Sequence, residues 1–296
     1  MDIQGSTCLN SPEFMDYLTF FRQRNRVNNL ISPTDSHVIV LRDKHLMSVF
    51  FQQYQIPTPE IVALVYNGRF YDNQWNELPI ETLVGDREFD FFLKKTDGEC
   101  ADSVFHLTSM EQLKGFRFQK GKYILQKRVY QHPGMNRLWD GAINTCRICT
   151  LFDGEQVSVL SAVLRVGTSA SAPVDNWAHG GISVGVHEDG SLVEYGVFKP
   201  GYGGKAYQHP DTGIRFCDFV IPEYEKAVEL CKRAHLTLKE TPAIGWDIAI
   251  TTEGPTIIEG NDNWEISLMQ ASNHGLKKEW EQFMRDYQKN MRNDGE

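Results

Sequence analysis

The chain has 296 residues, of which 41% are hydrophobic and 23% are charged, and its formal net charge is −9. This composition excludes wholesale disorder, and a chain of this length can form one large core or two modest ones. The acidic balance, without a Lys/Arg stripe, argues against nucleic acid as the main partner. No apolar stretch approaches the roughly 18 residues that cross a bilayer and no secretion signal opens the chain, so we expect a cytoplasmic protein with no membrane span.

The amino-terminal residues 1–14 show no periodicity and end in a string that resembles a restriction-site scar, directly before a second methionine. We interpret them as a vector-derived tail outside the fold. Residues 15–42 predict a helix followed by a short strand at His37–Leu41. Asp43 is a good N-cap, and it predicts a helix that continues to Tyr54, just before two closely spaced prolines.

Strand signals dominate the centre of the chain. Apolar runs predict two strands, at Phe89–Lys94 and Tyr123–Val129. Acidic-Gly dipeptides predict three hairpins, at Asp153-Gly154, Asp189-Gly190 and Glu253-Gly254. Apolar residues at three- and four-residue spacing predict two helices, Pro222–His235 and Leu276–Met291, whose apolar sides we expect to pack into the core. Tight turns imply antiparallel sheets, so the predicted class is α+β with two lobes.

The six cysteines are scattered, which is unlike a disulfide framework. Cys146 and Cys149 form a C-x-x-C, but they lie in a predicted strand, Thr145–Leu151, where residues three apart face opposite sides. We therefore interpret them as buried thiols that pack as small hydrophobic side chains, in preference to a zinc or redox pair.

Acidic and amide side chains gather around the third hairpin, and their hard oxygens suit Mg²⁺. Glu259 and Asn261 are two residues apart on a predicted strand and so share a face. A strict two-residue turn would set Asp247 opposite Gly260, facing the other way, whereas a bulge or a longer loop would bring it beside Glu259. The metal hypothesis requires that irregularity, and carboxylates on the surface of a hairpin are the alternative.

These residues resemble the metal-binding D…E-x-N pattern of the ATP-grasp enzymes, and the string from Gly245 to Asn261 is similar to the sugar-transfer-associated group among them. The resemblance extends over roughly residues 43–270. It implies an ATP-grasp fold, in which two α+β lobes with mainly antiparallel sheets clasp a nucleotide, the small lobe at 43–128 and the large lobe at 129–296. It also implies ATP and two Mg²⁺ ions, with Glu259 bridging both and Asp247 and Asn261 each holding one.

Upstream motifs follow the family's order. Asp43-Lys44 and the end of the Phe91–Lys94 run resemble the elements that carry the two phosphate-binding lysines, and Ile124–Val129 resembles the hinge strand whose backbone binds adenine. The resemblance implies nucleotide contacts at Lys44, Lys94, Gln126, Lys127, Val129 and Asn144.

A second set of motifs resembles the substrate-binding elements of glutamate-ligase relatives. Two guanidinium groups can grip a carboxylate and the charge that develops when it is phosphorylated. The resemblance implies a catalytic set of Arg147, Arg165 and Lys94, and substrate contacts at Arg165, Asp175, Asn176, Gly180, Gly181 and His209. The string from His209 to Gly213 also recurs in the subgroup, and we assign it no mechanism beyond a substrate contact.

The implied reaction is ATP- and Mg-dependent ligation. The γ-phosphoryl group moves to a small-molecule carboxylate, such as an amino acid or a sugar-linked acid, and an amine or related nucleophile attacks the resulting acyl phosphate. Two alternatives stay open: a small-molecule kinase that phosphorylates a hydroxyl, and a non-catalytic nucleotide-binding protein. The latter is motivated by the segment after Lys94, where Lys95–Ser103, with Gly98 as its single glycine, replace the proline and glycine-rich loop of the family.

Overall fold

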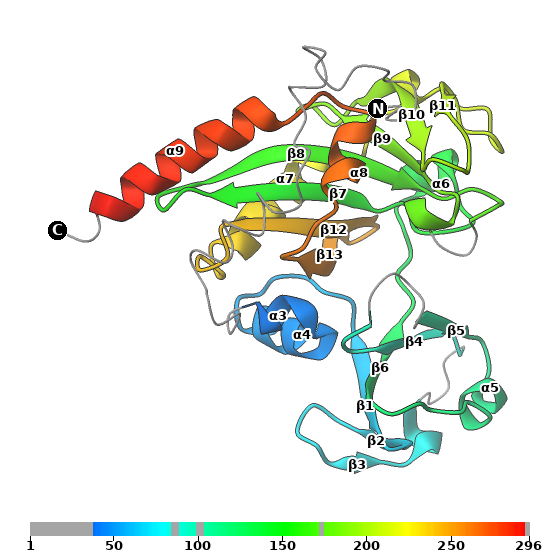
Figure 1. Ribbon diagram of the computed structural model, residues 1–296. Helices are drawn as coiled ribbons and strands as arrows, with labels where there is room; N and C mark the ends of the chain where they lie inside the picture. The colour runs from blue at the N-terminus through cyan, green and yellow to red at the C-terminus, as the bar shows by residue number, and fades with distance from the viewer. Residues whose placement is uncertain (1–37, 84–88, 99–103, 172–174, 294–296) are drawn as a thin grey trace. The chain divides into compact units, whose positions relative to one another are not determined.

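The computed structural model describes residues 38–83, 89–98, 104–171 and 175–293. They form two compact units, each built on its own antiparallel sheet (Figure 1). The small unit is Ile39–Val129, and the large unit contains Val38 and the described residues from Tyr130 onward. The proposed vector-derived tail and the helix expected within 15–42 lie outside the described residues.

The sheet of the small unit, within its described residues, has six strands in the spatial order β3-β2-β1-β6-β4-β5. The strands are β1 Ile61–Tyr66, β2 Arg69–Tyr71, β3 Glu77–Leu78, β4 Phe91–Lys95, β5 Val104–Leu107 and β6 Lys122–Lys127. The helices are α3 Ile39–Arg42, α4 Lys44–Gln53, α5 Met110–Lys114 and the 3₁₀ turn η1 Ile80–Leu83. Strands β4 and β6 match two of the predicted runs, while the β1–β2 hairpin at Asn67-Gly68 was not predicted.

Strand alternation divides the residues of β4 and β6 between two faces. Phe91, Leu93 and Leu125 are buried in a core on one face. Their neighbours Lys94 and Gln126 therefore lie on the opposite face, where their side chains meet. One face thus holds the unit together, and the other carries two of the predicted nucleotide-binding residues.

The short strand predicted at His37–Leu41 is wrong where the structure describes it, because Ile39–Arg42 is the helical turn α3. Val38 and Leu41 are buried and three residues apart, a spacing that suits a helical turn, so packing overrides the β propensity of the run. The predicted helix after Asp43 is confirmed as α4. The Asp43 carboxylate accepts hydrogen bonds from the backbone N–H groups of His45 and Leu46, both at 3.0 Å.

The described part of the large unit contains a seven-stranded sheet in the order β11-β10-β9-β8-β7-β12-β13. The strands are β7 Cys146–Phe152, β8 Val157–Val166, β9 Ile182–Val186, β10 Leu192–Phe198, β11 Lys205–Ala206, β12 Ala243–Thr251 and β13 Gly254–Asn261. The helices are α6 Pro133–Leu138, α7 Tyr224–His235, α8 Ile266–Ala271, α9 Lys277–Asn293 and the 3₁₀ turns η2 Trp177–His179 and η3 Phe216–Asp218. Every strand pairing in both sheets is antiparallel within these residues, which confirms the predicted α+β class.

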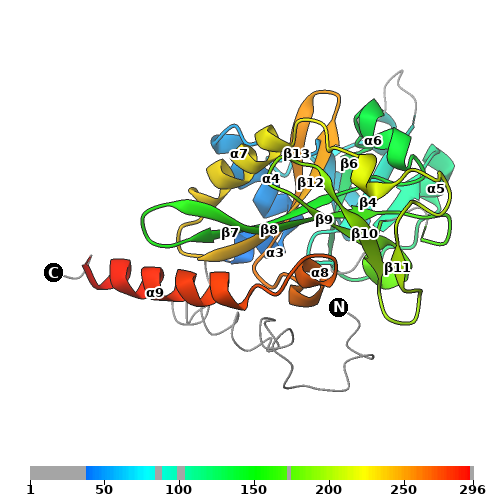
Figure 2. The same ribbon diagram turned by 90° about the horizontal axis from the view of Figure 1, so that it is seen from above.

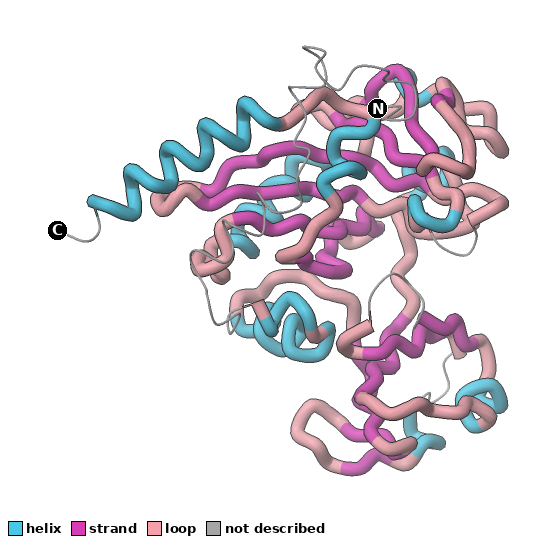
Figure 3. Tube along the Cα trace, in the orientation of Figure 1, coloured by secondary structure: helices cyan, strands magenta, loops and turns pink. Residues whose placement is uncertain are grey.

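Helices cover both faces of this sheet. Helix α7 lies on one face and helices α8 and α9 on the other, as Figures 1 and 2 show. The strands form a continuous layer between them (Figure 3). On α9, Trp280, Phe283 and Tyr287 are buried against the sheet, as the predicted apolar stripe requires. Helix α7 begins two residues after Pro222, later than predicted.

All three predicted acidic-Gly hairpins are confirmed, because each dipeptide joins adjacent antiparallel strands: β7–β8, β9–β10 and β12–β13. Cys146 and Cys149 are both buried free thiols on β7, as expected. None of the described helices combines the length and apolar character that a membrane span requires.

Candidate functional site

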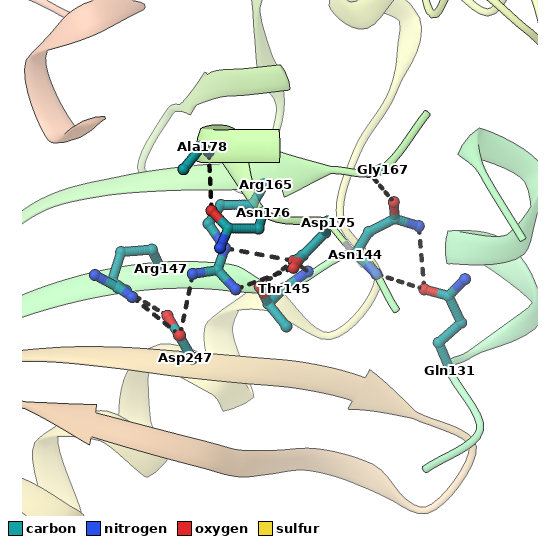
Figure 4. Close-up of polar contacts among 10 residues, drawn as sticks. All are labelled: Gln131, Asn144, Thr145, Arg147, Arg165, Gly167, Asp175, Asn176, Ala178 and Asp247. Carbon is teal, nitrogen blue, oxygen red and sulfur yellow. Dashed lines mark hydrogen bonds and ion pairs between the residues drawn. The ribbon is translucent and has the colours of Figure 1, made fainter. Parts of the chain in front are cut away.

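The centre of the polar network in the large unit is the carboxylate of Asp247 on β12 (Figure 4). Arg147 donates to it from Nε and from Nη2, the latter at 2.9 Å, and Arg165 donates from Nη1 at 3.2 Å. The side chains are 4% exposed for Asp247, 8% for Arg147 and 17% for Arg165. This is a buried ion cluster in which one carboxylate joins two guanidinium groups.

The sheet register explains why these residues meet. Strand β7 lies between β8 and β12, and Arg147 on β7 is directly opposite Asp247 on β12. Arg147 is also opposite Val163 of β8, and Arg165 is two residues further along the same face. The cluster therefore follows from strand order and face, although 100 residues of chain separate Arg147 from Asp247.

Asp175 holds the other side of Arg165. Arg165 donates from Nη2 to Asp175 at 3.0 Å, and Thr145 donates its backbone N–H at 2.9 Å and its hydroxyl to the same carboxylate. Burial alone would lower the pKa of Arg165, but attraction to Asp175 and Asp247 outweighs it and raises that pKa. The guanidinium is therefore fixed in its charged form between two aspartates.

The irregularity that the metal hypothesis needs is present in the β12–β13 pair. Asp247 pairs with Glu259 and Ile248 with Ile257, so Ile258 is the extra residue of a bulge. The bulge places Asp247 and Glu259 opposite each other. Asn261, two residues beyond Glu259 on the same strand, donates to the Gly245 carbonyl at 3.4 Å.

These three residues supply two carboxylates and one amide. Groups of three or more His, Cys, Asp or Glu suited to a metal do not occur among the described residues, so a cation here would depend on the Asn261 amide as well. Hard oxygens of these kinds are nevertheless the donors that Mg²⁺ takes in proteins. The chemistry of the set fits magnesium.

Asn144, a predicted nucleotide contact, is fully buried and bonded within the protein. Its amide donates to Gln131 at 3.1 Å and its oxygen accepts from the Gly167 N–H at 3.3 Å (Figure 4). The amide also donates to the Trp139 carbonyl at 2.7 Å. This geometry supports a structural role for Asn144, because its side chain connects the segment just before β7 to the segment just after β8. Gln131 was not predicted, and no sequence signal marks it.

His209, a predicted substrate contact, is also fully buried. Its Nε2 lies 2.8 Å from the Gly167 carbonyl and donates to it, so Nδ1 is the acceptor for the backbone N–H groups of Asp211 and Thr212, at 3.2 and 3.3 Å. Asp211 in turn binds Ser169. The recurring string from His209 to Gly213 thus forms a turn that fixes the segment following Arg165, which supports a structural role for His209.

The predicted substrate loop is shaped by backbone contacts. Asn176 accepts a hydrogen bond from the Ala178 N–H at 2.9 Å and caps η2 (Figure 4). Gly180 has a φ of +97°, which favours glycine, and a Cβ on Gly181 would lie 2.4 Å from the Asp175 carbonyl oxygen. The two glycines therefore allow the loop to pass close to Asp175, the residue that binds Arg165.

In the small unit, the predicted phosphate-binding lysines are half-buried and donate to neutral oxygens. Lys44 Nζ donates to the Gly98 carbonyl at 2.7 Å, and Lys94 Nζ donates to Gln126 Oε1 at 2.7 Å. Lys127 ends β6 and pairs with Glu60, and Val129 follows it. Of the Lys95–Ser103 segment that motivates the non-catalytic alternative, residues 99–103 lie outside the described residues.

Solved structures of similar shape include three ligases or synthetases, each 12% identical to this chain. N5-carboxyaminoimidazole ribonucleotide synthetase from Thermotoga maritima aligns over 83% of this chain and 50% of its own, with a TM-score of 0.47. D-alanine–D-alanine ligase from Bacillus anthracis aligns over 86% and 70%, with a TM-score of 0.49. L-amino acid ligase from Bacillus licheniformis aligns over 82% and 47%, with a TM-score of 0.48.

The chain thus spans about half the length of the first and third of these proteins. A comparison with curated proteins gives no match. The family model described as sugar-transfer associated ATP-grasp matches residues 112–285, more than half of the chain, including the Arg147, Arg165, Asp247 and Glu259 cluster. The chain therefore belongs to the sugar-transfer associated ATP-grasp family.

Proposed function

We propose that this chain is an ATP- and magnesium-dependent ligase that joins a small-molecule carboxylate to an amine or a related nucleophile. The observation that carries the proposal is the bulged β12–β13 pair, which sets Asp247 opposite Glu259 and beside two arginines. Membership of the ATP-grasp family supports the use of ATP.

In the proposed enzyme, Asp247, Glu259 and Asn261 hold Mg²⁺. Three N–H groups of Arg147 and Arg165 bind the Asp247 carboxylate, so a metal ion held there would share that carboxylate with the two arginines. Bound magnesium, in one or two ions, would neutralise charge on the phosphates.

Nucleotide binding is assigned to the small unit. Lys44 and Lys94 would bind the phosphates, because a hydrogen bond between an ammonium group and an anionic oxygen is stronger than one to a neutral oxygen. Gln126, Lys127 and Val129, at the end of β6 and just beyond it, would face the adenine. Phosphoryl transfer depends mainly on positioning and charge neutralisation, so these residues need supply no nucleophile.

The two arginines are assigned different tasks. Arg165 is the more exposed one and, because Asp175 holds its other side, it can turn toward an anion without losing all of its partners. We propose that it binds the substrate carboxylate and the acyl phosphate, with Asp175, Asn176, Gly180 and Gly181 shaping the loop beside it. Arg147 is bound twice to Asp247 and would fix that carboxylate, rather than grip the substrate as the sequence predicts.

The proposed reaction balances as follows. The substrate carboxylate attacks the γ-phosphorus of ATP, the bond to the bridging oxygen breaks, and ADP leaves. The nucleophile then attacks the acyl carbon, phosphate leaves with the carboxylate oxygen, and the nucleophile loses its proton. The products are the joined compound, ADP and inorganic phosphate.

The test is ADP release by the purified protein with Mg-ATP and a pool of amino acids and sugar acids. Hydroxylamine would trap an acyl phosphate as a hydroxamate, whereas a kinase would leave a stable phosphate monoester. Glu259→Gln should lower turnover on the order of 100-fold, because it removes a metal ligand. Glu253→Gln, an exposed residue at the turn of the same hairpin, is the matched control and should leave turnover unchanged.

Equal losses in both variants would contradict the proposed metal site. Calorimetry that detects no Mg-ATP binding would contradict the ligase as a whole and leave a non-catalytic member of the family.

A further inference from the structure

The Asp247 carboxylate has two cationic partners before any metal binds. Arg147 and Arg165 are two buried cations, Asp247 and Asp175 are two buried anions, and the four are joined by ion pairs. Glu259, which pairs with Asp247 across the bulge and attracts Arg165, adds one further negative charge. The metal site proposed above therefore already contains two positive charges, both bonded to one of its ligands.

A free divalent cation that approaches Asp247 meets both guanidinium groups. Repulsion between a doubly charged ion and one neighbouring positive charge lowers affinity by roughly tenfold or more even at the dielectric constant of water, and by more in a buried site. An anionic ligand that arrives with the cation removes this penalty, because its negative charge offsets the arginines. The arginines thus weaken the binding of a metal alone, compared with the same carboxylates without them, and weaken it less when a polyanion arrives with the metal.

We infer that Arg147 and Arg165 are resident counter-ions of Asp247, which exclude free divalent cations from the site and admit a cation only together with a polyphosphate. The inference rests on the proposed metal role of Asp247 and Glu259. It makes Arg147 a determinant of metal selectivity and of binding order, which is a different role from gripping the substrate.

The two arginines should contribute unequally. Arg147 gives Asp247 two hydrogen bonds and is opposite it in the sheet register, so it is fixed there. Arg165 gives Asp247 one hydrogen bond at 3.2 Å and binds Asp175 at 3.0 Å, so it can release Asp247 and keep a partner. Removing Arg147 should therefore expose the site to cations more than removing Arg165.

The experiment titrates Mn²⁺, a paramagnetic substitute for Mg²⁺ with the same preference for oxygen ligands, into the full chain without nucleotide. Bound and free Mn²⁺ are separated by electron paramagnetic resonance. Wild type should bind weakly, and Arg147→Gln should bind at least tenfold more tightly. Arg147→Lys keeps the charge and should stay weak. The double variant Arg147→Gln/Asp247→Asn should lose the gain, which would assign it to this site.

Arg147→Gln leaves the buried Asp247 with one cation fewer and is expected to be less stable, so its unfolding temperature should rise on addition of Mn²⁺. If it does not fold, Arg165→Gln, at the more exposed position, replaces it with a smaller expected gain. Repeating the wild-type titration with a non-hydrolysable ATP analogue should tighten Mn²⁺ binding at least tenfold.

Two results would overturn the inference, and they differ. Wild type that binds Mn²⁺ without nucleotide as tightly as Arg147→Gln would end the counter-ion role and leave the proposed metal site standing. Wild type that fails to bind Mn²⁺ with the ATP analogue, together with an Arg147→Gln variant that also fails, would remove the metal site and with it the proposed function.

Discussion

The predicted functional cations of the two units differ in burial, because Arg147 is buried whereas Lys44 and Lys94 are half-buried. Lys44 and Lys94 in the small unit donate to a carbonyl and to an amide oxygen, whereas Arg147 and Arg165 in the large unit donate to carboxylates. An anion that displaces a neutral oxygen strengthens the bond, while one that displaces a buried carboxylate leaves a charge unpaired. We infer that the arginine cluster is part of the fold as well as of the proposed site.

The strongest way to break this comparison is to remove one cation from each unit. Arg147→Met should lower the free energy of unfolding by about 3–5 kcal/mol, because Asp247 would remain buried without its bidentate partner. Lys94→Met should lower it less, because the half-buried Lys94 leaves a neutral amide oxygen of Gln126, and not a buried charge, without this donor. Urea denaturation at pH 7 measures both, and equal losses would contradict the distinction.

A buried histidine of the large unit extends the comparison, because it is a titratable group whose hydrogen-bond partners are neutral. His235 Nε2 lies 2.8 Å from the Thr241 carbonyl and donates to it, and Nδ1 accepts from the Thr150 hydroxyl at 2.7 Å. Thr150 accepts in turn from the Trp246 indole at 2.8 Å. Burial lowers the pKa of His235 to about 4, although the bond to Thr241 opposes this.

The sign of the pH effect follows from this pKa. Between the ordinary pKa of 6.5 and the native value of about 4, the unfolded chain binds a proton at His235 that the native chain does not. The stabilising contribution is therefore complete above pH 6.5 and is lost as the pH falls toward 4, a loss of about 3 kcal/mol. His235→Gln should flatten the unfolding free energy across this interval, and parallel curves for the two proteins would show that His235 is not responsible.

The backbone around Asp175 offers a third test, since the cluster needs a fixed carboxylate there. A Cβ on Gly181 would lie 2.4 Å from the Asp175 carbonyl oxygen, so Gly181→Ala must displace the residue that binds Arg165 and Thr145. We expect a loss of about 2 kcal/mol in unfolding free energy. Gly204→Ala is the control in the same unit, because a Cβ there meets nothing within 4 Å. If Gly204→Ala loses as much unfolding free energy as Gly181→Ala, the loss does not come from displacement of Asp175.

Local signals in the sequence identified much of the fold. Asp43 marks a helix start because its side chain can bond only the N–H groups just ahead of it, and acidic-Gly pairs mark tight hairpins because glycine adopts a positive φ. The strand predicted at His37–Leu41 was wrong, because burial of Val38 and Leu41 decides the conformation of that run more than β propensity does.

The candidate site was predictable in composition and not in geometry. The sequence shows that Asp247 needs a bulge or a longer loop to lie beside Glu259, but it does not show which of the two occurs, nor that Ile258 is the residue left unpaired. The Arg147–Asp247 pair depends on β7 lying beside β12, a neighbour relation made by the tertiary fold. For the same reason the buried Asn144 and His209 resembled ligand contacts in the sequence, although both are bonded within the protein.

The smallest expected change in unfolding free energy concerns Asp43, a carboxylate of the small unit that can be compared with Asp247 of the large unit. Burial tends to raise the pKa of Asp43, but the Leu46 N–H and the Lys122 ammonium at 3.1 Å hold it below its ordinary value. Asp43→Ala should lower the free energy of unfolding by about 1 kcal/mol, because it removes the N-cap of α4. Asp43→Asn keeps a capping oxygen and should recover most of this loss. Urea denaturation distinguishes the two, and an Asp43→Asn variant as unstable as Asp43→Ala would mean that charge, as at Asp247, is the larger contribution here as well.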